Sequence, residues 1–278
     1  MAYDINAIKK KLKTLTENGD QKTEREKLNW FRPEMGTTQI RFLPYKDSRT
    51  GEPFQVVLYF DTKKLSPYRI VSPTTFDMDD PIVNTLNELR KTKQPLETWK
   101  FMKDIEPKEK YYAPIVVRGK EDEGVFVWEI SRKLVNDIYG HIAGEDLADS
   151  DVTDPDTGYD FVLTVTKSDR LWNGKPVKDY GITPRMRPSP LHKVTKEKEA
   201  LLESVPNLEN YFKAALMSAD KLAERFNSAL AGGGPAEETE SETGTGRNTA
   251  VEVDDDEEIS TNVSPSVKTS IDDAFDDL

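Results

Sequence analysis

The chain has 278 residues, 36% of them hydrophobic, and no cysteine, which excludes disulfide bonds, thiol nucleophiles and cysteine-bound metal sites. Its formal net charge of −12 comes from residues 233–278, which hold 14 acidic and two basic residues, whereas residues 1–232 carry equal numbers of both signs. The acidic average therefore does not exclude a nucleic-acid partner for the neutral body. Because no 18-residue apolar run and no signal peptide are present, we expect a soluble protein of the cytoplasm.

The chain begins with a basic segment that has the spacing of a short helix over residues 4–17. Its lysines are Lys9, Lys10, Lys11 and Lys13. A run of lysines on a helix is ordinarily a solvated face, but it also suits an arm that docks elsewhere. The residues alone leave both interpretations open.

The next segments predict a small β-barrel. Residues 37–60 alternate like a hairpin, and further strands are expected at residues 111–117, 124–130 and 159–166. Helical spacing predicts one helix at residues 81–93 and another at 131–139, directly before the last strand. About five short strands with one inserted helix indicate a mainly β, α+β protein whose core is an OB-fold-like Greek-key barrel.

The remainder of the chain predicts a helical addition and a tail. After a basic, proline-rich connector at residues 185–190, helices are expected at 196–203 and 208–230, with an apolar stripe that packs on the barrel. Residues 233–278 are rich in Gly, Thr, Glu and Asp and should be disordered. We therefore divide the chain into an arm (1–20), a core (21–232) with an inserted subdomain at about 61–110 and C-terminal helices at about 196–230, and an acidic tail (233–278).

No catalytic constellation is evident. The two histidines, His141 and His192, stand in no motif of a general base, and no glycine-rich loop carries the Lys-Ser/Thr of a phosphate cradle. One acidic cluster resembles a calcium loop, but its glycine is misplaced and no glutamate closes it, which favours a solvated turn. Its members are Asp149, Asp151, Asp154, Asp156 and Asp160. We predict that the chain is not an enzyme.

Basic residues accompany aromatic residues in four separate segments. Single-stranded nucleic acid requires this combination, because bases stack on aromatic faces while cations follow the phosphates. Each aromatic could equally serve the core, but the repeated pairing favours binding. The candidate nucleic-acid-binding residues are Arg41, Lys63, Lys64, Tyr68, Arg69, Lys108, Lys110, Tyr111, Tyr112, Trp128, Arg170 and Trp172.

The order of these motifs resembles the single-stranded DNA-binding, helix-destabilising proteins of T-even-like tailed bacteriophages, nearly from end to end. The landmarks are Lys9-Lys10-Lys11, Ile40-Arg41-Phe42-Leu43-Pro44, Tyr111-Tyr112-Ala113-Pro114-Ile115-Val116-Val117, Gly124-Val125-Phe126, Phe161-Val162-Leu163-Thr164-Val165 and the terminus Asp272-Asp273-Ala274-Phe275-Asp276-Asp277-Leu278.

This resemblance implies a division of labour along the chain. It implies an N-terminal arm for cooperative self-association, an OB-fold for DNA and a tail that recruits replication and recombination proteins. Position by position, Arg41 matches a phosphate-contacting arginine, Tyr111 and Tyr112 an aromatic pair, and Trp128 an aromatic of the next strand. The tail residues implied in partner binding are Asp272, Asp273, Phe275, Asp276, Asp277 and Leu278.

One departure from the family concerns a metal. Well-studied members hold zinc with one histidine and three cysteines, but residues 70–88 of this chain contain neither residue type. We therefore predict that this subdomain, unlike that of the well-studied members, contains no metal, and we expect no cofactor. Its stability would come from the apolar residues Val71, Phe76, Met78, Ile82, Val83, Leu86 and Leu89.

The sequence supports two hypotheses. The first is a non-enzymatic protein that coats single-stranded DNA in phage replication, recombination and repair, with a tail that can occupy the cationic groove as a DNA mimic. The alternative is an acidic-tailed interaction or chaperone protein that binds basic proteins, with the barrel as scaffold. Replacing Tyr111 and Tyr112 with alanine should weaken function only under the first hypothesis.

Overall fold

A computed structural model describes residues 27–144, 147, 150–172 and 175–231. The strands are β1 (Gly36–Phe42), β2 (Gln55–Phe60), β3 (Ile70–Val71), β4 (Lys108–Val117), β5 (Phe126–Ile130), β6 (Asp160–Trp172) and β7 (Lys175–Pro184). The helices are α2 (Pro81–Arg90), α3 (Leu96–Ile105), α4 (Arg132–Ile142), α5 (Thr195–Glu203), α6 (Leu208–Lys213) and α7 (Ala219–Leu230), with short 3-10 turns η1 (Pro73–Phe76) and η2 (Glu121–Glu123). The α+β fold class predicted from the sequence is confirmed. None of the described helices is long and apolar enough to cross a membrane.

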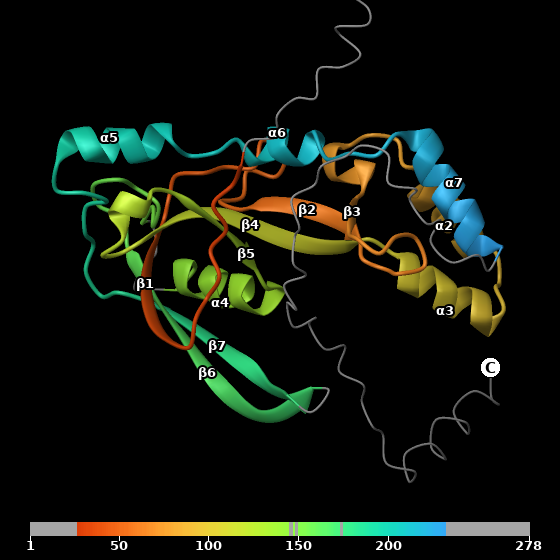
Figure 1. Ribbon diagram of the computed structural model, residues 1–278, viewed down its shortest axis with the longest axis horizontal. Helices are drawn as coiled ribbons and strands as arrows, with labels where there is room; N and C mark the ends of the chain where they lie inside the picture. Colours follow the sequence, from red (N-terminus) through yellow and green to blue (C-terminus); the bar gives the residue numbers. More distant parts are fainter. Residues whose placement is uncertain (1–26, 145–146, 148–149, 173–174, 232–278) are drawn as a thin grey trace, which may run out of the picture.

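The strands form one seven-stranded antiparallel sheet in the order β3-β2-β4-β1-β6-β7, with β5 pairing to β4 beside this path (Figure 1). Strand β4 is the central strand of the sheet because it is long enough to pair with three other strands. Its first half pairs with β2, its second half pairs with β1, and β5 pairs along its other edge. No pairing between described residues closes the sheet into a barrel, so the OB-fold stays a prediction.

The predicted hairpin at residues 37–60 is wrong. Strands β1 and β2 do not pair with each other; both pair with β4, in consecutive stretches that end at Tyr112 and begin again at Ile115. The alternation of apolar residues identifies a strand, but the partner is chosen by contacts distant in sequence. Strand β7 was not predicted from the sequence, because its prolines and lysines interrupt the alternation of apolar residues. Strand β6 continues beyond its predicted end at residue 166.

Both faces of the sheet are covered (Figure 1). Helix α4 covers one face, where Leu134, Val135 and Ile138 join a core built from alternate residues of β1, β4, β5 and β6. Helices α5 and α6 cover the opposite face, together with the segment around Trp30, which bridges to Val127 of β5. A charged side chain on these strands therefore has no automatic access to solvent.

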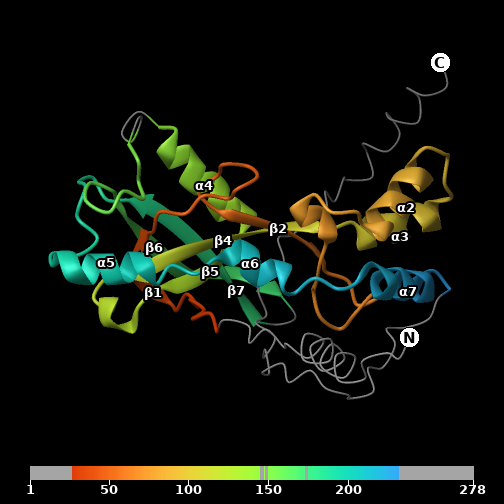
Figure 2. The ribbon, with the colours of Figure 1, turned by 90° about the horizontal axis from the view of Figure 1, so that it is seen from above.

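Helices α2, α3 and α7 form a helical lobe beyond the ends of β2 and β4 (Figure 2). Its core contains Ile82 and Leu86 of α2, Met102 and Ile105 of α3, and Leu222 of α7. The C-terminal helix predicted at 208–230 is thus two helices, of which α6 packs on the sheet and α7 on this lobe. At this break the backbone of Ser218 is extended, and α7 begins at the next residue.

The predicted α2 is confirmed, and its N-terminus is fixed by Asp80. This buried carboxylate accepts hydrogen bonds from the amides of Ile82 and Val83 and from the hydroxyl of Ser72. Of the apolar residues expected to hold the subdomain, Ile82, Val83, Leu86 and Leu89 lie in the lobe core, and Val71 and Phe76 lie in the adjacent sheet core. Met78 is 53% exposed, so its expected contribution to the core is wrong.

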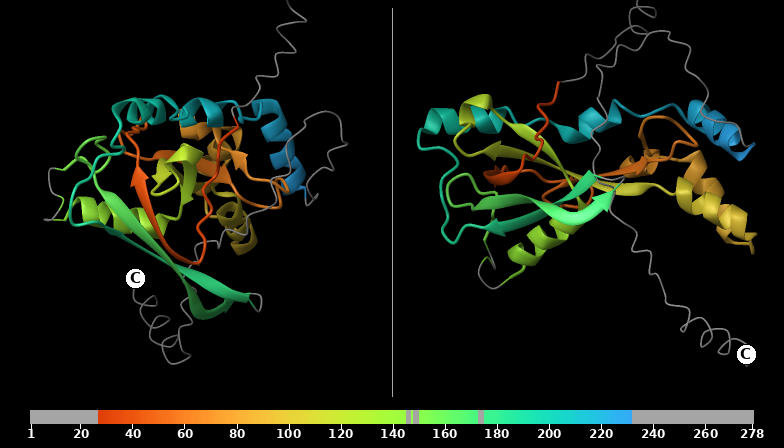
Figure 3. Two further views of the ribbon diagram at one scale, coloured as in Figure 1. Left: turned by 60° about the vertical axis from the view of Figure 1, so that its left-hand side comes forward. Right: turned by 60° about the horizontal axis from the view of Figure 1, so that its bottom comes forward.

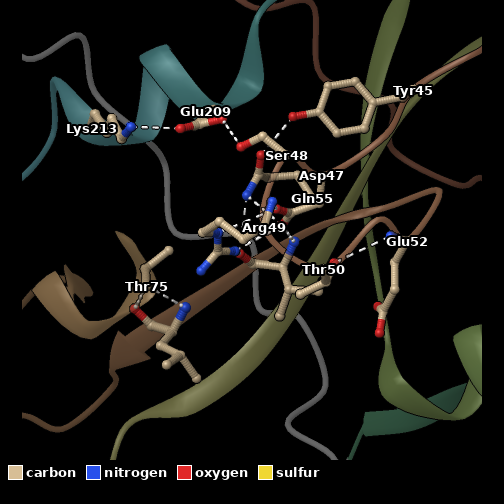
Figure 4. A network of polar contacts seen from close by, with 12 residues as sticks. Tyr45, Asp47, Ser48, Arg49, Thr50, Glu52, Gln55, Thr75, Glu209 and Lys213 are labelled. Atoms are coloured by element: carbon tan, nitrogen blue, oxygen red, sulfur yellow. Dashed lines mark hydrogen bonds and ion pairs between the residues drawn. The ribbon is translucent and has the colours of Figure 1, made fainter. Parts of the chain in front are cut away.

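The loop between β1 and β2 is held by a polar network (Figure 4). Asp47, 1% exposed, accepts hydrogen bonds from the guanidinium of Arg49 and from the side-chain amide of Gln55. Ser48 bonds Glu209 of α6, which also pairs with Lys213 at 2.5 Å. Burial opposes ionisation of Asp47, but the hydrogen bonds from Arg49 prevail and lower its pKa. The network therefore fastens α6 to the sheet.

Candidate nucleic-acid interface

Four of the candidate residues lie in the protein interior. Arg41 is 0% exposed, Tyr112 2%, Trp128 3% and Lys110 9%. All four lie on buried stretches of β1, β4 or β5. In this conformation they contribute to the fold and present little surface to a ligand.

Arg41 lies in a cluster that joins β1, β6 and the connector after β7. Its guanidinium lies 3.3 Å from a carboxylate oxygen of Asp160 and donates a hydrogen bond to the carbonyl of Ser189. Arg118 pairs with the same Asp160 oxygen at 2.7 Å and donates to the carbonyls of Pro190 and Leu191. Burial lowers the pKa of Arg41 to about 10, against the opposing effect of Asp160. These contacts fasten the connector to the sheet.

Tyr112 belongs to a second interior network. Its hydroxyl lies 3.2 Å from the hydroxyl of Tyr59 and 3.3 Å from Glu129, and burial raises its pKa well above the usual value. Arg69, half-buried, pairs with Glu129 at 2.8 Å and with Asp61 at 3.1 Å. Burial acts to lower the pKa of Arg69, but the two carboxylates raise it overall. The positive charge of Arg69 is thus already compensated.

Trp128 and Tyr111 lie on the opposite face of the sheet. Trp128 stacks on Phe42 with ring centroids 6.4 Å apart and meets Phe31 edge-on at 5.8 Å. Tyr111 is half-buried, and its hydroxyl donates to Glu109 at 2.8 Å. Burial, followed by this hydrogen bond, raises the pKa of Tyr111 to about 12. Of the predicted aromatic pair, only Tyr111 reaches the surface.

The connection between β2 and β3 brings several candidates to the surface. Lys63 and Lys64 are exposed, and Tyr68 is 70% exposed. Lys64 pairs with Asp104 of α3 at 2.5 Å, and its ammonium lies 5.3 Å from the ring centroid of Phe101. Lys108 is exposed where β4 begins, directly after α3. This connection and α3 therefore form one basic, aromatic-bearing surface.

The β6–β7 hairpin carries the remaining candidates away from this surface (Figure 3). Arg170 is exposed and pairs with Asp179 of β7 at 3.0 Å. Trp172 is the last residue of β6 and pairs with Lys175, but the orientation of its side chain lies outside the described structure. The hairpin projects from the sheet as a separate basic extension, so the candidate residues form no single contiguous site.

The family model described as gp32 DNA binding protein like matches residues 34–230, which include the whole sheet and the helical lobe. The chain belongs to the gp32-like DNA-binding protein family. This confirms the resemblance to the single-stranded DNA-binding proteins of T-even-like phages, a family of binding proteins rather than enzymes. No curated protein sequence matches the chain significantly.

The sequence missed one feature of this gp32-like domain. Trp99 of α3 is 48% exposed, and the ammonium of Lys103 lies 5.5 Å from its ring centroid. The signal was present: Pro95 precedes Leu96, and Met102 and Ile105 have helical spacing. With α3 assigned, Trp99 would have been placed at the edge of this apolar face, three residues before Met102.

The acidic residues before β6 make contacts within the protein, and Asp149 of this cluster lies outside the described residues. Asp154 accepts hydrogen bonds from the amides of Asp156 and Thr157, and Asp160 is committed to two arginines. Across the described part of the chain, no group of three or more His, Cys, Asp or Glu side chains could hold a metal ion. The arm lysines and the tail residues named above lie outside the described residues.

Proposed function

We propose that the chain coats single-stranded DNA during phage replication, recombination and repair, in the cytoplasm of the infected host and without catalysing a reaction. The observation that carries this proposal is the match of residues 34–230 to the DNA-binding family. The exposed basic and aromatic side chains on the β2–β3 connection support it. The alternative of a chaperone for basic proteins gains no support from a surface that carries both lysines and exposed aromatic rings.

The chemistry of this surface suits a strand of any sequence. Lys63, Lys64 and Lys108 can neutralise phosphates, and the exposed ring of Tyr68 offers a face on which a base can stack. Neutralising phosphates and stacking on ring faces carry little information about base sequence. Binding should therefore depend steeply on salt and weakly on sequence.

The segments outside the described residues would regulate this binding. The lysines of the arm would promote cooperative self-association along the strand, and the acidic tail would recruit replication and recombination proteins. A tethered polyanion also reaches an effective concentration on the order of millimolar, so the tail can compete with DNA for the lysines. Removing residues 233–278 should strengthen DNA binding, most of all at low salt, where screening is weakest.

A fluorescence titration tests the proposal. The full chain is titrated with single-stranded DNA, single-stranded RNA and duplex DNA of equal length at 50 mM and 200 mM salt, and tryptophan quenching is followed. We expect single-stranded DNA to bind more tightly than duplex, with a Kd that rises at least tenfold between the two salt concentrations. Preference for duplex, or a Kd independent of salt, would refute single-strand coating.

A further inference from the structure

Helix α3 exposes a stripe that the fold does not use. Leu96 is 70% exposed and Trp99 48%, and Lys100 and Lys103 continue the same side of the helix at the spacing of one turn. The other side, with Met102 and Ile105, lies in the core of the helical lobe. With 48% of its surface exposed next to two lysines, the Trp99 side chain can make a contact outside the fold.

The stripe carries positive charge on two lysines that form no ion pair within the described residues. On the neighbouring side of the lobe, two acidic groups are already paired, Asp104 with Lys64 at 2.5 Å and Glu106 with Arg90 at 2.6 Å, while Glu97 of α3 is exposed without an ion pair among the described residues. In contrast, Lys100 and Lys103 have no ion-pair partner within the described residues. Lys103 instead lies over Trp99, with the ammonium 5.5 Å from the ring centroid. An anion approaching α3 therefore meets uncompensated lysines.

The stripe lies on the same helix that the candidate interface contacts. Helix α3 lies at the beginning of β4 (Figure 2), and Lys64 ties the β2–β3 connection to Phe101 and Asp104 of this helix. A strand that follows the β2–β3 connection at Lys64 would thus meet α3 next. Core residues of protein interfaces are depleted in lysine, so the lysines flanking Trp99 favour a polyanion over a protein as the occupant.

We propose that Trp99, flanked by Lys100 and Lys103, is an additional stacking position for the single strand, which extends the binding path from the sheet onto the helical lobe. This inference rests on the proposed function. A base would stack on the exposed indole face, and the two lysines would meet the adjacent phosphates. The contact with Lys103 restrains the indole before binding and so lowers the ordering cost.

The test compares Trp99→Ala and Trp99→Phe in the full chain by anisotropy titration with labelled single-stranded DNA at several salt concentrations. Stacking carries no net charge, so Trp99→Ala should raise the Kd about tenfold at every salt concentration and leave the slope of log Kd against log salt unchanged. Trp99→Phe should recover most of the affinity. The double variant Lys100→Ala, Lys103→Ala should instead reduce the slope by about two.

Leu230→Ala is the matched control, because Leu230 of α7 is also 48% exposed on the helical lobe; it should leave the Kd unchanged. Thermal unfolding of each variant checks that the lobe is intact. If the parent chain binds and Trp99→Ala binds equally well, the stacking role is refuted while the proposed function stands. Loss of self-association without loss of affinity would assign Trp99 to a protein contact and also refute it. If the parent chain itself fails to bind, the proposed function is refuted.

Discussion

The sheet and the helical lobe use the same residue types in opposite ways. On the sheet, Arg41, Tyr112 and Trp128 are buried and paired with other protein groups. On the lobe and its connection to the sheet, Tyr68 and Trp99 are exposed beside lysines. The difference follows from coverage, since helices lie on both faces of the sheet but on only one side of α3. A basic or aromatic residue is thus a candidate contact only where the fold leaves it uncovered.

The largest expected effect comes from Arg41. Replacing Arg41 with methionine removes one partner of a buried ion pair and leaves the Ser189 carbonyl without its donor, which should lower the free energy of unfolding by about 3 kcal/mol. Arg118 still neutralises Asp160, which keeps the loss at the low end of the range for buried pairs. Urea denaturation measures the change.

Arg170→Met provides the comparison, because its pair with Asp179 is exposed and should contribute at most about 1 kcal/mol. Under native conditions Arg41→Met should bind single-stranded DNA like the parent chain. Unchanged stability together with much weaker binding would mean that Arg41 contacts a phosphate, and that the connector after β7 moves away on binding.

The second effect concerns affinity rather than stability. Replacing Lys63 and Lys64 with alanine should weaken single-strand binding about tenfold at low salt and reduce the salt slope by one to two, because each lysine lost removes about one released counterion. Stability should change by less than about 1 kcal/mol, since the pair of Lys64 with Asp104 is exposed.

A control for this variant is Lys120→Ala, which removes another exposed lysine, paired with Glu123 on the turn between β4 and β5. It should leave both the affinity and the slope as they are. If Lys63→Ala, Lys64→Ala and Lys120→Ala all reduce the slope alike, the phosphate contacts are spread over the surface rather than concentrated at the β2–β3 connection.

The contrast also shows how far the sequence could lead. Strand β4 and helices α2 and α4 could be predicted because local alternation or helical spacing reports them. The pairing of β1 with β4 and β6 could not, because it depends on contacts between residues far apart in the chain. The family resemblance was confirmed because it rests on the order of motifs rather than on their contacts.

The candidate site was predicted less completely for a related reason. The pattern Ile40-Arg41-Phe42 is that of an ordinary strand with one face in water, and the second cover over Arg41 comes from the connector at Ser189. No residue near Arg41 in the sequence indicates that the connector at Ser189 covers it. Exposed Lys63 and Tyr68 were found because they lie on a loop, where side chains reach solvent by default.

The smallest expected effect tests the aromatic pair of β4. Tyr112→Phe removes a hydroxyl that lies within hydrogen-bond distance of Tyr59 and Glu129, so the free energy of unfolding should fall by about 1 kcal/mol. Its affinity for single-stranded DNA should not change, because the ring is 2% exposed. Urea denaturation and anisotropy titration measure the two quantities on the same preparation.

Tyr68→Phe is the matched control, since Tyr68 is 70% exposed and phenylalanine keeps a ring for stacking; neither stability nor affinity should change. The burial of Tyr112 also means that replacing Tyr111 and Tyr112 together with alanine would unfold part of the core, so Tyr111→Ala alone is the informative change at this position. If Tyr112→Phe weakens binding while its stability equals that of the parent chain, the bound conformation must expose the face of β4 that α6 now covers.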